Sequence, residues 1–161
     1  MGKDTGFIEF EKQAVPRREI QERVQDFREY ELNYSDNDIR QQASRCMDCG
    51  IPFCHMGCPL GNMIPDWNDL VYRDQWQDAL GALHSTNNFP EFTGRICPAP
   101  CEDSCVLNEH YTLDPEEKIK KKHAVTIEQI EKHIAERGWE EGWIQPQPPN
   151  KETCLLYTSP S

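Results

Sequence analysis

Cysteine is the residue type in this sequence with the clearest chemistry. The chain has eight cysteines, and seven of them fall into two groups. Their spacing is Cys46-x2-Cys49-x4-Cys54-x3-Cys58-Pro59 and Cys97-x3-Cys101-x3-Cys105. A cubane iron-sulfur cluster needs four ligands around one small object, which tight loops plus one distant residue supply with little strain. The spacing therefore predicts iron-sulfur chemistry.

The first group is close to the bacterial ferredoxin pattern, in which the cysteine before a proline ligates the other of two clusters. Cys58 precedes Pro59 and takes that place. The remaining three cysteines of the first group then serve one cluster, while Cys58 serves the second. If the second group gives one cysteine to the first cluster and two to the second, the second cluster lacks one ligand.

Glu131 is our candidate for the missing ligand. The helical period places it on the same face as Ile127 and Ile134. A carboxylate aimed at a core needs a partner, since burial of an unpaired charge is costly, and iron is such a partner. Two alternatives stay open: a three-iron cluster, or a Glu131 that reaches solvent or an arginine. His55 also lies within the first group, although a histidine there is more often a neighbour of the cluster than a ligand.

A zinc site is the main competing interpretation of the cysteines. Zinc favours four closed ligands and usually two pairs of cysteines separated by two residues, whereas only Cys46 and Cys49 form such a pair here. A secreted disulfide scaffold is the other alternative, but residues 1–10 lack the features of a signal peptide. No apolar run is long enough to cross a membrane. We therefore expect a cytoplasmic protein with no membrane association.

Composition limits the remaining function classes. The net charge of -11 and the pI of about 4.9 argue against a nucleic-acid groove. Only 37% of the residues are hydrophobic and the mean hydropathy is -0.80, so we expect a thin core stabilised by bound cofactors. The sequence has no Gly-x-Gly-x-x-Gly loop after a strand, which excludes a dinucleotide site of that type.

The elements that would position these cysteines are helices, and we predict an all-α fold with irregular cysteine-rich loops. Ser35 and Asp38 form a capping box before a helix that carries Cys46 on its buried face. A further helical stretch begins at Pro65, with Trp67 and Trp76 in the core. Residues 46–65 and 94–105 are expected to be loops.

Both ends of the cysteine region are expected to carry a helix. After Pro16, the spacing of Ile20, Val24 and Phe27 predicts a helix packed on the core. Near the other end, Thr126 and Gln129 are expected to cap a last helix. Its predicted apolar face is Ile127, Ile130 and Ile134.

We divide the chain into residues 1–34, an extension with one helix, residues 35–143, the two-cluster domain, and residues 144–161, a linker and tail. The run Lys120-Lys121-Lys122 is interpreted as part of a solvated insertion. Residues 154–161 are similar to a translated sequencing adapter, so Cys154 is not counted as a ligand; the alternative is a natural tail.

Longer motifs resemble a known family. These are Gln42-Ala43-Ser44-Arg45-Cys46-Met47-Asp48-Cys49-Gly50-Ile51-Pro52-Phe53-Cys54, then Asn62-Met63-Ile64-Pro65-Asp66-Trp67, then Thr86-Asn87-Asn88-Phe89-Pro90-Glu91-Phe92-Thr93-Gly94-Arg95-Ile96-Cys97-Pro98-Ala99-Pro100-Cys101-Glu102. They resemble the amino-terminal iron-sulfur domain of the glutamate synthase small (beta) subunit. That domain is related to the amino-terminal domain of dihydropyrimidine dehydrogenase, and the resemblance extends to about Trp143.

The resemblance implies two [4Fe-4S] clusters with divided ligands. The implied ligands are Cys46, Cys49, Cys54 and Cys105 for one cluster, and Cys58, Cys97, Cys101 and Glu131 for the other. It also implies an intact subunit that passes electrons from NADPH or NADH through FAD to a large (alpha) subunit, which forms L-glutamate. FAD and the nicotinamide cofactor would bind to domains outside this sequence, so this part alone relays electrons and has no catalytic residues. A free-standing two-cluster ferredoxin or a related flavin oxidoreductase subunit remains the alternative.

Overall fold

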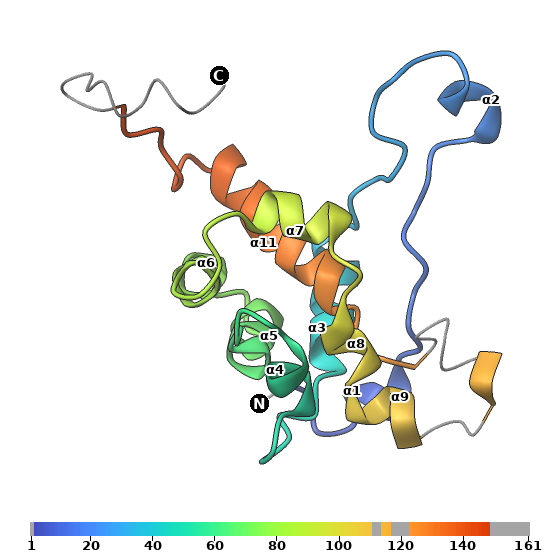
Figure 1. Cartoon of the computed structure of the whole chain (residues 1–161), viewed down its shortest axis with the longest axis vertical. Coiled ribbons are helices and arrows are strands. Elements are labelled where there is room, and N and C mark those ends of the chain that lie inside the picture. The colour runs from blue at the N-terminus through green and yellow to red at the C-terminus, as the bar shows by residue number, and fades with distance from the viewer. Residues whose placement is uncertain (1, 111–113, 117–122, 149–161) are drawn as a thin grey trace.

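Helices joined by irregular segments make up the part of the chain that the computed structural model describes, namely residues 2–110, 114–116 and 123–148. Within these ranges there is no strand, and a single antiparallel bridge joins Arg17 to Glu31. The prediction of an all-α fold is thus confirmed. The helices, labelled in Figure 1, are α1 (Gly6–Glu9), α2 (Ile20–Arg23), α3 (Asp36–Ser44), α4 (Phe53–Gly57), α5 (Ile64–Tyr72), α6 (Trp76–His84), α7 (Pro90–Ile96), α8 (Pro100–Asp103), α9 (Val106–His110) and α11 (Ile127–Glu140).

The helix before the first cysteine begins as the sequence predicts. Ser35 is the N-cap of α3, and its Oγ accepts a hydrogen bond from the Asp38 amide at 3.2 Å. Ile39 and Ala43 are buried on the inner face of α3, in line with Cys46 just beyond its end. The helix therefore delivers Cys46 into the core.

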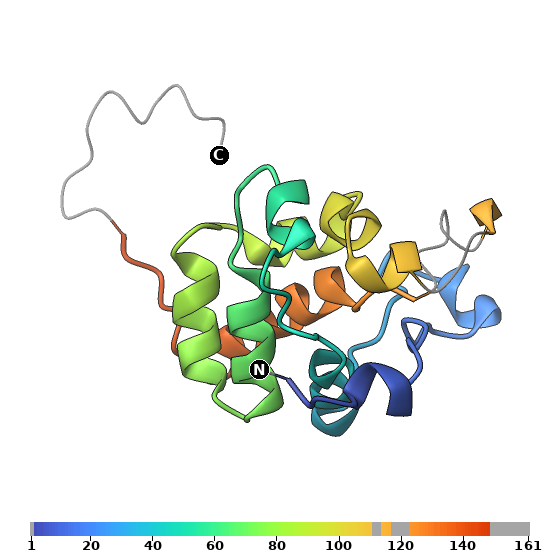
Figure 2. The same ribbon diagram turned by 90° about the horizontal axis from the view of Figure 1, so that it is seen from below.

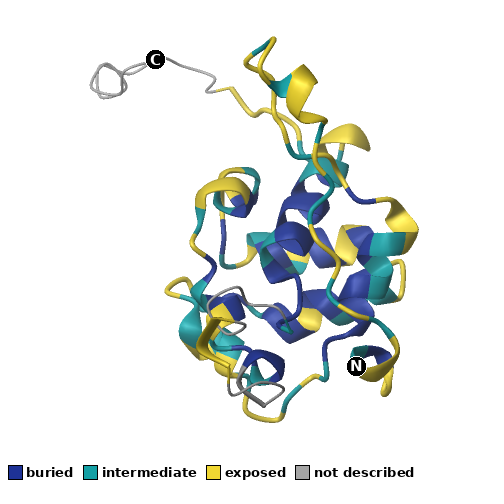
Figure 3. Ribbon diagram, turned by 90° about the vertical axis from the view of Figure 1, so that its right-hand side faces the viewer, coloured by how far each residue is buried: buried dark blue, intermediate teal, exposed yellow. Residues whose placement is uncertain are grey.

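The core is formed mainly by α3, α5, α6 and α11. Trp67, Trp76 and Ile130 are buried there, as the helical spacing predicts, and Figure 3 shows buried residues concentrated along these central helices. α7 lies against α11 in Figures 1 and 2. Gly94 permits this approach, because a Cβ at that position would lie 2.6 Å from the Cβ of Lys132.

The two cysteine segments contain more helix than we predicted. The segment 46–65 includes α4, and the segment 94–105 includes the end of α7 and all of α8. Proline explains part of the difference, because Pro90 and Pro100 occupy the first turns of α7 and α8. A proline is tolerated there because backbone N–H groups in the first turn of a helix have no acceptor within the helix, so the N–H that proline lacks is not needed.

The prediction for the segment after Pro16 is wrong. Only Ile20–Arg23 are helical, and Ile20, Val24 and Phe27 are exposed instead of packed on the core. The segment 16–32, which we call the arm, runs out from the body and back, with α2 held away from the other helices at the upper right of Figure 1. The spacing of Ile20, Val24 and Phe27 fits a helix, but this pattern does not show whether another element packs against that face.

The predicted start of the last helix is confirmed, because Thr126 is the N-cap residue of α11. The apolar face of α11 is buried as expected, at Ile127, Ile130 and Ile134. The expected side-chain capping bond is not made, since the Thr126 hydroxyl donates instead to Oε1 of Gln42 at 2.9 Å. The hydroxyl thus ties α11 to α3.

Three expectations concern residues outside the described ranges, namely Lys120–Lys122, Cys154 and the adapter-like segment 154–161. No helix in the described part of the chain is long and apolar enough to span a bilayer.

Candidate metal centre

Four cysteines from three parts of the chain line one small cavity. Asn68 and apolar side chains such as Ile64 and Ile127 complete its wall. The cysteines are Cys46 and Cys49 after α3, Cys54 in α4, and Cys105 between α8 and α9. We call them the first set. They include the three neighbours in sequence that the spacing assigned to one cluster, together with one member of the second group.

The first set is costly to ionise without a cation. Burial, together with the smaller effect of neighbouring thiols, raises the pKa of Cys46 to about 11 and that of Cys54 to about 12. Burial and Cys105 also raise the pKa of Cys49. A bound metal stabilises thiolates. The set therefore has the donor chemistry of a metal centre, because four neighbouring thiols are unfavourable to ionise without a bound cation.

An orphaned amide next to the first set agrees with a bound group. Asn68 is fully buried, and neither its Nδ2 nor its Oδ1 has a hydrogen bond of normal geometry within the described residues. Its side chain favours the thiolate of Cys46. An N–H directed at the sulfurs is the type of donor that tunes an iron-sulfur cluster. The residues here thus fit a [4Fe-4S] cluster.

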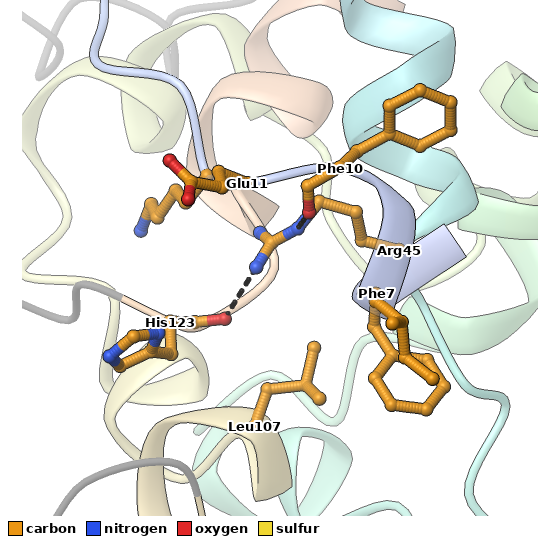
Figure 4. Close-up of a pocket in the computed structure, with 8 residues that line it drawn as sticks. Phe7, Phe10, Glu11, Arg45, Leu107 and His123 are labelled. Carbon is orange, nitrogen blue, oxygen red and sulfur yellow. Dashed lines mark hydrogen bonds between the residues drawn. The ribbon is translucent and has the colours of Figure 1, made fainter. Parts of the chain in front are cut away.

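Arg45 fixes the position of Cys46. Its guanidinium is buried and donates to the carbonyl oxygens of Phe10 at 3.0 Å, Ala124 at 2.8 Å and His123 at 2.8 Å. Figure 4 shows the bond to His123 at the wall of a cavity of about 400 Å³, which α1 and Leu107 also line. The clamp joins the amino-terminal segment, the end of α3 and the start of α11 beside the first set.

The second set consists of Cys58, Cys97, Cys101 and Glu131. Burial is the main cause of the raised pKa of the Cys101 thiol, followed by the charge of the adjacent Glu102. The charges of Cys58, Glu131 and Cys97 also raise it, so these three groups lie near Cys101. α4 packs on α8, which brings Cys58 close to Cys101. Gly57 makes this contact possible, since a Cβ there would lie 2.3 Å from Ser104 Oγ. The same contact also brings Cys54 near Cys105.

Glu131 is 7% exposed and lies in a cradle of polar side chains. Asn87 Nδ2 donates to its Oε1 at 2.9 Å, Asn62 Nδ2 is 3.4 Å from its Oε2, and the Thr93 hydroxyl donates to Oε1. Burial raises the pKa of Glu131, while the bonds from Thr93 and Asn87 oppose that rise. The cradle holds the carboxylate in place within the core. The alternative that Glu131 reaches solvent or an arginine does not describe this arrangement.

Each cysteine group contains one residue with left-handed backbone. These are Asp48, at φ 50°, and Ala99, at φ 50°. Non-glycine residues in this region are strained, and the surrounding structure must hold them there. The Ala99 amide donates to Cys97 Sγ at 3.4 Å, and the Asp48 backbone favours the Cys46 thiolate. The strained turns direct backbone N–H groups at sulfur.

Sequence reasoning missed the supporting residues Asn62, Asn68, Asn87 and Thr93. Asn68 alone had an available signal, because it stands one residue after Trp67 on a helix whose inner face is predictable. The cradle residues come from different elements, so only the folded chain reveals their meeting. His55, which we considered as a minor ligand candidate, lies half-buried in α4. Within the described ranges, no three His, Cys, Asp or Glu side chains converge closely enough to hold a single metal ion.

A protein-family model matches residues 23–143. It describes domain II of dihydropyrimidine dehydrogenase, a 4Fe-4S cluster domain. The match includes both cysteine sets and Glu131.

Curated relatives match nearly the whole chain. The glutamate synthase [NADPH] small chain of Mycobacterium tuberculosis (strain H37Rv) is 53% identical over 149 residues, which cover 92% of this chain and 28% of the relative. The corresponding small chain of Bacillus subtilis is 48% identical over a match that covers 95% of this chain and 31% of the relative. Glutamate synthase [NADH] of Schizosaccharomyces pombe is 43% identical over 92% of this chain and 7% of its own. The chain therefore spans less than a third of the length of these relatives.

Proposed function

Because this chain belongs to the family of 4Fe-4S domains described for domain II of dihydropyrimidine dehydrogenase, we propose that it is the electron-relay domain of a glutamate synthase small subunit. The predicted resemblance to that subunit is confirmed by relatives of 48–53% identity. The observation that carries the proposal is the separation of the cysteines into two sets, one lining a cavity and one near Cys101, each supplied with hydrogen-bond donors.

Each set is proposed to hold one [4Fe-4S] cluster, with the ligands that the resemblance implies. Cys46, Cys49, Cys54 and Cys105 would hold the first, and Cys58, Cys97, Cys101 and Glu131 the second. The clusters, when bound, supply one-electron transfer. The chain's own part is to fix the thiolates, to bury Cys46 and Cys105, and to direct amide donors at sulfur.

The remainder of the enzyme is proposed from the same relatives. Their names specify NADPH in the bacterial small chains and NADH in the yeast protein. We infer that FAD and one of these nicotinamide cofactors bind to domains outside this sequence, and that a large subunit makes L-glutamate from glutamine and 2-oxoglutarate. We expect the complex to lie in the cytoplasm. The division of the chain after residues 34 and 143 remains a prediction.

Metal analysis tests the proposal directly. The chain is reconstituted with iron and sulfide without oxygen, and iron, zinc and acid-labile sulfide are measured per chain together with EPR of the reduced protein. We expect about eight irons, about eight sulfides and signals from two interacting clusters. Zinc without sulfide would overturn the electron-relay function and leave a structural module.

A further inference from the structure

The arm presents an apolar tip to solvent. Val24 is 79% exposed, and Ile20 and Phe27 are exposed on the same excursion of the chain. None of residues 11–33 is buried, as the exposed colour of this region in Figure 3 illustrates. Isolated exposed apolar residues are ordinary, but three of them on one projecting segment are typical of an interaction site.

The arm is braced, so its tip is presented in a defined place. The Arg18 amide donates to the Tyr30 carbonyl at 2.8 Å, and the Leu32 amide donates to the Pro16 carbonyl at 2.8 Å. The Arg18 guanidinium also binds both carboxylate oxygens of Asp26 at 2.8 Å. These bonds join the two limbs of the arm to each other.

Glu29 attaches the arm to the cluster-binding body. Its carboxylate accepts from Arg95 of α7 at 2.8 and 3.0 Å and lies 3.0 Å from the buried ammonium of Lys132 in α11. Arg95 also binds Glu136. Bidentate carboxylate–arginine pairs fix geometry as well as adding energy. The anchoring helices are those that carry Glu131 and lead into Cys97, so the arm is linked to the second set.

The comparisons distinguish the arm from the shared cluster domain. The family model begins at residue 23, within α2, and leaves out the first limb of the arm. The match to the Mycobacterium tuberculosis small chain leaves out only about 13 of 161 residues, because it covers 92% of the chain, and therefore includes residues 16–32. The complete arm is thus shared with glutamate synthase small chains. Its partner should be specific to that enzyme.

The position of the other end of the described chain helps to identify the partner. Residues 144–148 lie on the side of the body opposite α2 in both Figure 1 and Figure 2. A domain that continues from there would begin far from the arm. The stretch that matches this chain makes up 7% of the S. pombe relative but 28% of a bacterial small chain. The S. pombe protein is therefore much longer and carries further parts of the enzyme in the same chain as this domain. A separate large chain would occupy that role in bacteria.

We propose that the arm is a docking element for the large chain of glutamate synthase, which receives its apolar tip in a concave apolar surface. Arg28 lies beside the tip with its side chain 83% exposed and its Nε 4.0 Å from Asp26 Oδ2, so the basic charge there is paired within the arm. The inference rests on the proposed function, because it requires a large-chain partner. It goes further by naming the surface that meets it.

Binding of the reconstituted chain to the purified large chain of Mycobacterium tuberculosis glutamate synthase tests this inference. The arm variant is Val24→Glu with Phe27→Glu, and the control is Ile8→Glu, which changes an exposed apolar residue of α1 outside both cysteine groups. We expect the arm variant to raise the Kd at least roughly tenfold and the control to change it less than about twofold. Iron content and thermal melting should be unaltered in the arm variant, since both side chains are exposed.

Four results would overturn the docking role: an arm variant that binds like the unmodified chain, a control that loses binding equally, an unmodified chain that does not bind, or a chain that pairs with a second copy through the arm. Sedimentation of the chain alone detects the last. Iron, sulfide and EPR measurements on the same samples test the electron-relay function separately. An unmodified chain that carries two intact clusters but does not bind the large chain would therefore refute the docking surface alone.

Discussion

The two ligand sets lie side by side but in different surroundings. The first set has four thiols in a mainly apolar cavity with one orphaned amide, whereas the second has a carboxylate held by Asn62, Asn87 and Thr93. Reduction potentials of iron-sulfur clusters depend on ligand charge, hydrogen bonds to sulfur and exposure. Two clusters with the same iron and sulfide content can thus differ in reduction potential within one domain. The following experiments test whether the sets are as distinct as their surroundings indicate.

Removal of iron should have the largest effect, because it removes what both sets share. The apolar core is small, and metal binding of this kind is coupled to folding. We expect chelation under anaerobic conditions to abolish cooperative thermal unfolding and to reduce helical circular dichroism. A chelated chain that stays helical and melts cooperatively would show that the core is sufficient without clusters.

Glu131→Ala should affect the second set alone. We expect iron to fall from about eight to about four per chain, with the EPR signal of the first cluster retained. Glu131→Gln keeps a donor oxygen and the shape of the side chain, so it should retain iron with an altered signal. Loss of both clusters in Glu131→Ala would contradict the independence of the sets, and no change in either variant would contradict ligation.

Gly57→Ala should weaken both sets by a smaller amount, since α4 and α8 bring members of each together. The new methyl group meets Ser104 and the carbonyl of Pro100, and overpacking of this kind costs about 1–3 kcal/mol. Gly81→Ala is the matched control, because nothing lies within 4 Å of a Cβ there. Chemical unfolding of the reconstituted proteins should show lower stability for Gly57→Ala only. Equal stabilities would mean that the α4–α8 contact adapts freely.

Asn68→Leu should have the smallest effect and separates the sets by potential. It removes a donor beside Cys46, and a lost hydrogen bond of about 1 kcal/mol corresponds to a shift on the order of 40 mV for one electron. We expect the first cluster to become harder to reduce in an EPR-monitored redox titration, while the second is unchanged. Asn87→Leu is the reciprocal variant and should move only the second cluster. A shift of the wrong cluster in either variant would show that the two sets cannot be tuned separately.

The candidate ligands follow from local properties of the sequence, whereas their support does not. Cysteine spacing and the helical period of Ile127, Glu131 and Ile134 are such local properties. In the structure four of the cysteines line one cavity, and the charges of Cys58, Cys97 and Glu131 act on Cys101. The assignment of ligands to clusters remains a prediction. The cradle of Glu131 could not be foreseen, because Asn62, Asn87 and Thr93 are distant in sequence and no local pattern couples them.

The error in the arm has the same origin. A helical period predicts which residues share a face, but not whether another element covers that face. Ile20, Val24 and Phe27 therefore met the criteria for core residues and are exposed. Pro90 and Pro100 illustrate a second limit, since proline both ends helices and begins them.

The clamp made by Arg45 restricts when the first centre can be completed during synthesis. Its carbonyl acceptors belong to Phe10, His123 and Ala124, so they come from both ends of the described domain. A nascent chain that has emerged only as far as Cys105 holds every thiol of the first set but lacks two of the three groups that orient Arg45 next to Cys46. The ribosome must deliver the start of α11 before the clamp can close. Loading of that centre is then expected to follow translation of the whole domain, so that binding of iron and closure of the clamp occur together.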